Sequence, residues 1–157
     1  MKLDGKKVLM VVPYSQFRDE EFFGPSKILA EAGATIVAAS TTARVCHGMQ
    51  GGTVQAEVAI TDARADDYAA LVICGGSSVP EVFWNDKKLQ ELVSAMAAAG
   101  KVVAAICLST VVLAKAKLLA GRKATVYFLP QAIDALKEAG ATYVMETLLV
   151  HDNIILA

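Results

Sequence analysis

Short, continuous runs of apolar residues alternate along the chain with longer stretches in which apolar positions follow a helical period. The apolar runs predict strands buried on both faces, at residues 7–12, 34–39, 69–74, 101–106 and 123–127. The longer stretches predict helices at residues 19–32, 87–99, 109–119 and 130–139. Strands alternating with helices build β-α-β units, so the sequence predicts a single α/β domain over residues 1–157. We expect a doubly wound, mostly parallel sheet flanked by helices.

Helix ends and two irregular segments refine this outline. Asp19 and either Asn85 or Asp86 are candidate N-caps. Residues 41–61 predict an irregular hairpin, and residues 142–157 predict a second one that turns at residues 151–153. Residues 154–157 are apolar and close the given sequence, so we expect a further segment or a second subunit to cover them.

Composition narrows the function class. The 157 residues are 55% hydrophobic, 20% charged and 6% aromatic, with a net charge of −1, which excludes intrinsic disorder. The chain lacks the basic excess and the aromatic platforms of nucleic-acid binders. We see no signal peptide or membrane span, so we expect a cytoplasmic protein with no membrane partner. The three cysteines and two histidines have neither disulfide nor metal-site spacing.

Cys107 is the main candidate for chemistry. It lies in "AAICLST" (104–110), where a predicted strand passes directly into a helix. Such a turn presents a side chain at the carboxyl edge of the sheet, where open α/β sheets bind ligands. The helix N-terminus should lower the thiol pKa below its usual ~8.5. The alternative is a buried cysteine that acts as a small hydrophobe.

Gly75 and Gly76 end the neighbouring predicted strand in "VICGG" (72–76). They would let the backbone approach a ligand and direct N–H groups at an oxyanion, or they form a plain tight turn. On the predicted helix, Glu21 lies in one stripe with Pro25, Ile28 and Ala32, and this stripe is apolar except for Glu21. We therefore expect Glu21 to point inward with a raised pKa; the alternative is an ordinary acid of the first helical turn.

Five further residues are better explained by structure than by chemistry. His47 and His151 are expected at the surface, away from Cys107. Cys46 and Cys74 are expected to be buried, and Trp84 to pack a helix onto the core or to line a contact surface.

In this order, the motifs resemble the ThiJ/PfpI superfamily. Residues 8–40 are similar to its first strand, acidic helix and second strand, with Glu21 four residues before the helix proline. "LVICGG" (71–76), "AAICLSTVVLAKAKLLAGRKAT" (104–125) and "AIDALKEAGATYV" (132–144) resemble the glycine pair, the cysteine elbow and a later helix and strand. The resemblance implies a flavodoxin-like, class I glutamine amidotransferase-like fold, a homodimer or larger assembly, and no cofactor. The family normally continues with a loop and a helix beyond residue 157.

Two departures from the family pattern bear on the activity. Protease-like members place a histidine after the nucleophile, where this chain has Leu108. Many members also carry a histidine after the next strand, where this chain offers Tyr127. No histidine base for Cys107 is therefore visible, and peptide hydrolysis becomes the least favoured of the family activities.

Four functions remain open. In the first, Cys107 attacks a small dicarbonyl or a glycated group, Glu21 shuttles a proton, and the N–H groups of Gly76 and Leu108 hold the oxyanion. In the second, Cys107 is a redox sensor of a stress-protective or chaperone-like protein, and its sulfinic form is stabilised by protonated Glu21. The others are a protease-like hydrolase and a degenerate binding domain. The expected partners are a carbonyl substrate or an oxidant and a second copy of the chain.

Overall fold

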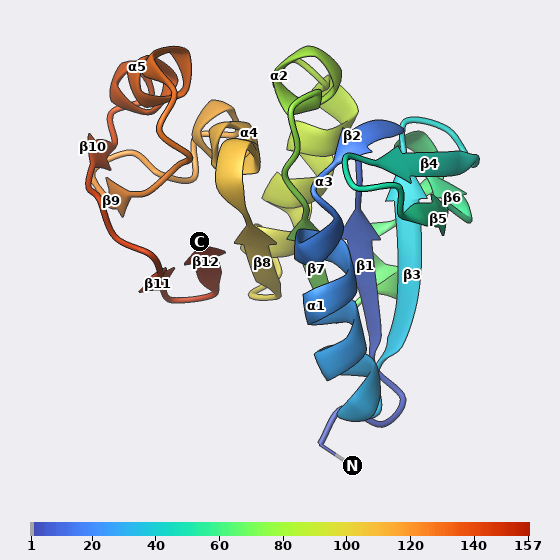
Figure 1. The fold of residues 1–157 in the computed structure, drawn as a ribbon. Coiled ribbons are helices and arrows are strands. Elements are labelled where there is room, and N and C mark those ends of the chain that lie inside the picture. Colours follow the sequence, from blue (N-terminus) through green and yellow to red (C-terminus); the bar gives the residue numbers. More distant parts are fainter. Residues whose placement is uncertain (1) are drawn as a thin grey trace.

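The computed structural model describes residues 2–157 and contains a seven-stranded sheet with helices on both faces (Figure 1). In spatial order its strands are β11 (Leu149–His151), β12 (Ile154–Leu156), β8 (Val102–Ala105), β7 (Ala70–Ile73), β1 (Lys7–Val11), β3 (Thr35–Ser40) and β6 (Val58–Ala59). All neighbouring pairs are parallel except β11 and β12. The predicted doubly wound, mostly parallel sheet is confirmed.

The remaining elements flank this sheet. The α-helices are α1 (Asp19–Glu31), α2 (Val79–Val82), α3 (Lys87–Ala98), α4 (Thr110–Lys115) and α5 (Pro130–Glu138). Short 3₁₀ turns are η1 (Ile60–Asp62), η2 (Ala65–Asp67) and η3 (Cys107–Ser109). Two small sheets join β2 (Ser15–Phe17) to β4 (Val45–Gly48) and β5 (Thr53–Gln55), and β9 (Lys123–Ala124) to β10 (Thr142–Tyr143). No helix in the described part of the chain has the length and apolarity of a membrane span.

Alternation along β1 shows how the two faces are built. Leu9 and Val11 pack into the larger apolar cluster, which includes the buried face of α3 and most of α4. Val8 and Met10 face the opposite cluster, together with Phe22 of α1. Because both faces are covered, the strand consists of apolar residues after its first position, as the sequence predicted.

The first helix corrects two predictions. Asp19 does not cap α1: the N-cap is Arg18, and the Asp19 carboxylate accepts hydrogen bonds from a distant loop. The predicted inward stripe is also wrong, because Ile28 is 67% exposed. Phe22 and Leu29 pack inward instead. The Asp86 cap of α3 is confirmed, since its side chain accepts a hydrogen bond from the Leu89 N–H.

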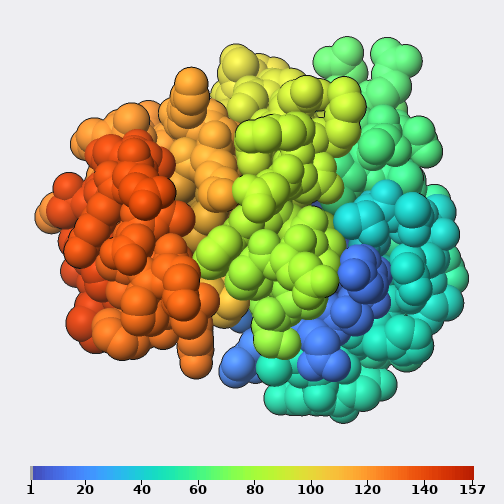
Figure 2. All heavy atoms as spheres, turned by 90° about the horizontal axis from the view of Figure 1, so that it is seen from above, coloured from blue at the N-terminus to red at the C-terminus, as the bar shows by residue number. Residues whose placement is uncertain are grey.

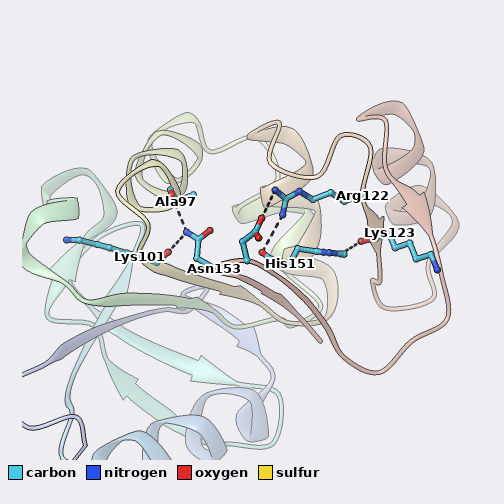
Figure 3. Close-up of polar contacts among 7 residues, drawn as sticks. Ala97, Lys101, Arg122, Lys123, His151 and Asn153 are labelled. Carbon is cyan, nitrogen blue, oxygen red and sulfur yellow. Dashed lines mark hydrogen bonds and ion pairs between the residues drawn. The ribbon is translucent and has the colours of Figure 1, made fainter.

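The β11–β12 hairpin forms at the predicted turn and lies against the rest of the domain (Figure 3). Asn153 donates to the carbonyls of Ala97 at 3.1 Å and Lys101 at 2.7 Å. Arg122 donates to the His151 carbonyl and to the Asp152 carboxylate. These bonds seat β12 beside β8 as a buried strand of the sheet.

The apolar end of the chain is therefore covered by the chain itself. Ile154 and Leu156 are 3% and 0% exposed. The expectation that residues 154–157 need a further segment or a second subunit is wrong for these two side chains, because both pack into the larger apolar cluster.

The predicted strand at residues 123–127 is reduced to β9, and the predicted helix at 109–119 to η3 and α4. β9 pairs only with β10, outside the main sheet, so residues 125–127 continue without a strand partner. This irregular stretch passes beside Cys107, where the Tyr127 N–H donates weakly to the Cys107 carbonyl at 3.5 Å.

Candidate active site

The chain adds strands to the sheet first on one side of β1 and then on the other. The chain leaves β1 through α1 to reach β3 on one side, whereas β7 pairs with β1 on the other side. Glu21 follows β1, Gly75 and Gly76 follow β7, and Cys107 follows β8. Parallel strands bring these residues to one carboxyl edge, at the topological switch point where open α/β sheets bind ligands. Figure 2 looks onto the top of the molecule as drawn in Figure 1, the edge where β1 and β3 end and α2 lies.

Cys107 occupies a strained turn. Its φ of 59° is left-handed, a conformation that costs a residue with a side chain about 1–2 kcal/mol. Three hydrogen bonds hold the turn: Cys107 N–H to the Ala157 carbonyl at 2.8 Å, Ser109 Oγ to the Cys74 carbonyl at 2.7 Å, and Trp84 Nε1 to the Leu108 carbonyl at 2.9 Å. The elbow predicted from sequence is present, with a 3₁₀ turn before the helix.

Gly75 is the point where Glu21 and Cys107 meet. Its N–H donates to Glu21 Oε2 at 2.6 Å. A Cβ added at Gly75 would lie 2.5 Å from that oxygen and 2.6 Å from the Cys107 Cβ. Only glycine leaves room for both side chains. A plain tight turn, the alternative for this glycine pair, therefore does not by itself explain Gly75.

Gly76 and Leu108 supply the other backbone donors. Hydrogen bonding from the N–H groups of Leu108 and Gly76 favours the charged form of the Cys107 thiol and opposes the rise of its pKa. Gly76 has a φ of 145° and bridges to Phe17, which fixes the direction of its N–H. An oxygen on a carbon bound to this sulfur would lie near two preorganised donors.

The pKa of the Cys107 thiol is raised to about 11, first by burial and next by the negative charge of Glu21. The donors and Arg18 oppose this shift without reversing it. The prediction of a lowered thiol pKa is therefore wrong, because the helix terminus is outweighed by desolvation and by a neighbouring carboxylate. Burial likewise raises the pKa of Glu21. The hydrogen bond from the Gly75 N–H, the charge of Arg18 and a hydrogen bond with Cys107 act to lower it, but burial outweighs them.

A cavity of about 340 Å³ opens in front of Cys107 and Glu21; we call it the main cavity. The sequence analysis missed most of its walls, which come from segments far apart in the chain: Arg18, Ile106, Thr125, Val126, Tyr127, Glu146, Thr147 and Ala157. Arg18 donates from Nε to Glu20 at 2.9 Å, and Thr125 Oγ1 donates to the Glu146 carbonyl at 2.6 Å. Apart from Tyr127, and from Ile106 next to Cys107 in the chain, nothing in the local sequence marks these residues, because only the fold places them beside Cys107.

The remaining candidates lie where the sequence analysis placed them. Cys46 and Cys74 are buried, and burial raises the pKa of both thiols. His151 Nε2 contacts the Lys123 carbonyl at 2.7 Å (Figure 3). His47 is an exposed residue of β4. Neither histidine lines the main cavity. Within residues 2–157, no group of three histidines, cysteines or carboxylates is placed to hold a metal ion.

Comparison with known proteins gives four findings. The DJ-1/PfpI family model matches residues 6–157. An uncharacterized protein of Methanocaldococcus jannaschii is 48% identical, over 99% of this chain and 76% of its own length. A deglycase of Pyrococcus abyssi is 32% identical, over 92% and 86%. The crystal structure of a ThiJ/PfpI domain protein from Brachyspira murdochii superposes with a TM-score of 0.90 at 27% identity, over 98% of this chain and 87% of that one.

Proposed function

The chain belongs to the DJ-1/PfpI family, and we propose that within it the protein is a cysteine-dependent enzyme acting on small dicarbonyls or glycated groups. One observation carries the proposal: Glu21 and Cys107 meet over Gly75 at the switch point of the sheet. A carboxylate with a raised pKa beside a neutral thiol is a base suited to take the thiol proton.

With methylglyoxal as substrate, the Cys107 sulfur forms a bond to the aldehyde carbon while its proton passes to Glu21. The carbonyl electron pair moves to oxygen, which accepts hydrogen bonds from the N–H groups of Gly76 and Leu108. Glu21 then gives this proton to the oxyanion, which completes the thiohemiacetal. Now deprotonated, Glu21 moves the proton from the thiohemiacetal carbon to the neighbouring carbon, through an enediol, which leaves a thioester on Cys107. Water then releases lactate and restores the thiol, so no external oxidant or reductant is consumed.

In this mechanism Glu21 is the base for Cys107, a role for which the sequence offers no histidine. Leu108 is 7% exposed and contributes its backbone rather than a side chain, which weighs against Cys-His proteolysis. The deglycase name of the Pyrococcus abyssi relative supports carbonyl chemistry in this family.

The test is methylglyoxal turnover followed as lactate. Cys107→Ser should abolish it, and Glu21→Gln should lower kcat about 10²–10⁴-fold by removing proton transfer while keeping the shape of the side chain. Glu31→Gln, at the other end of α1, is the matched control and should behave as wild type. Turnover that survives Cys107→Ser would refute the proposal.

Peroxide sensing at Cys107 is the second candidate. It is favoured by accessibility, since Cys107 lines a cavity while Cys46 and Cys74 are buried. In that case wild type would show no lactate formation, and mild peroxide would convert Cys107 to the sulfinic acid.

A further inference from the structure

Cys107 lies between two cavities. Besides the main cavity, a smaller one of about 120 Å³ opens on the side of the elbow; we call it the side cavity. Cys107, Arg18 and Tyr127 line both cavities. The side cavity is completed by Met49, Gly76, Ser77 and Leu108. A carbonyl carbon bonded to Cys107, with its oxygen at the N–H groups of Gly76 and Leu108, can direct one substituent into each cavity.

Met49 lines the side cavity but not the main cavity. It lies in the loop between β4 and β5, and the residue is 45% exposed. Its N–H donates to the Phe17 carbonyl at 2.8 Å, next to the start of α1. A flexible thioether side chain on a loop needs an anchored backbone to present a constant surface.

Asp19 provides that anchor. Its carboxylate is buried, and the residue is 8% exposed. One oxygen accepts from the Gln50 N–H at 2.8 Å and the other from the Gly52 N–H at 2.7 Å. Charge-assisted bonds of this kind are about twice as strong as neutral ones. The first turn of α1 therefore holds both Glu21, at the reacting sulfur, and Asp19, which fixes the loop that carries Met49.

We propose that Asp19 is a positioning residue that holds Met49 over the side cavity, and that this cavity receives the smaller substituent of the carbonyl substrate. The inference rests on the proposed function. An apolar cavity of about 150 Å³ holds one benzene molecule. At about 120 Å³ the side cavity is smaller, so it admits hydrogen or a short alkyl group and excludes a phenyl ring.

The test uses two symmetric 1,2-diketones that need no turnover, 2,3-butanedione and benzil. The Cys107 sulfur adds to one carbonyl carbon and the thiol proton moves to its oxygen; the smaller substituent of that carbon is methyl in the first probe and phenyl in the second. Rates of adduct formation are measured as the loss of iodoacetamide labelling of the Cys107 peptide and divided by the rates with N-acetylcysteine. Wild type should disfavour the phenyl probe.

Met49→Ala should raise the phenyl-to-methyl rate ratio about tenfold, whereas Met49→Leu, close in size, should keep it. Gln50→Ala removes an exposed side chain from the same loop but leaves the N–H that Asp19 accepts, so it should match wild type. Asp19→Ala should raise the ratio as Met49→Ala does, and the double variant should add nothing further. General damage to α1 would slow both probes alike and leave the ratio unchanged.

An unchanged ratio in Met49→Ala overturns the side-cavity assignment. A raised ratio in Met49→Ala with a wild-type ratio in Asp19→Ala overturns the positioning role of Asp19. If Asp19→Ala does not fold, Asp19→Asn takes its place. This variant keeps one acceptor oxygen and should give an intermediate ratio. If the ratios move as expected but no variant or wild type forms lactate from methylglyoxal, the proposed function fails while the side cavity stands.

Discussion

Replacing Glu21 by glutamine should make Cys107 more reactive toward iodoacetamide, although it should lower kcat for methylglyoxal about 10²–10⁴-fold. Glu21 Oε2 and the Cys107 Cβ both lie within 2.6 Å of the point where a Gly75 Cβ would stand. Glu21 Oε2 and the Cys107 Cβ are thus at most about 5 Å apart. At about 5 Å, Coulomb's law gives about 0.8 kcal/mol in water and about 3.3 kcal/mol at an effective dielectric constant of about 20. Removing the charge therefore raises the thiolate fraction at fixed pH about 4- to 250-fold.

A more acidic thiol is also a weaker nucleophile, with a Brønsted slope of about 0.5. The net gain in alkylation rate is then about 2- to 16-fold. The sign follows from the raised pKa of the Cys107 thiol, about 11. Thiolate is scarce at pH 8, and any change that lowers the pKa increases it.

The assay is the rate of Cys107 alkylation at pH 8, read from its peptide, for wild type, Glu21→Gln and the control Glu31→Gln. A full pH profile of wild type should rise towards pH 11. If Glu21→Gln reacts at the wild-type rate or more slowly, the charge of Glu21 does not oppose the thiolate, and this electrostatic reasoning is refuted.

Four further outcomes are expected. Gly75→Ala should lower methylglyoxal kcat/KM at least about 100-fold, because its Cβ would displace Glu21 and Cys107, while circular dichroism stays that of wild type. Asp86→Ala should cost about 1 kcal/mol in urea unfolding through loss of the α3 cap; no change would show that the cap contributes nothing. Under mild peroxide, Cys107 should gain oxygen before the buried Cys46 and Cys74, and the opposite order in peptide maps would contradict the site. Light scattering should give a homodimer or larger, as the family resemblance implies, and a monomer at micromolar concentration would contradict that expectation.

The sequence determined the parts of this protein that depend on local pattern. Apolar runs gave the strands of the parallel core because a strand covered on both faces has no polar positions. The order of strands and turns also brought Glu21, Gly75, Gly76 and Cys107 to one edge of the sheet, since the carboxyl ends of parallel strands lie together. The motif spacing further indicated the family, which the comparison confirms.

Tertiary structure decided what depends on distance between remote segments. The direction of the Cys107 pKa shift was mispredicted because the burial and charge at the sulfur come from Glu21 and the surrounding chain, not from the helix that follows. Asp19 was taken for a cap, yet it binds a loop more than 30 residues away, a pairing that local propensity cannot encode. The apolar side chains of β12 are buried in the larger apolar cluster, because hydrogen bonds of Asn153 to distant carbonyls and pairing with β8 seat β12 in the sheet.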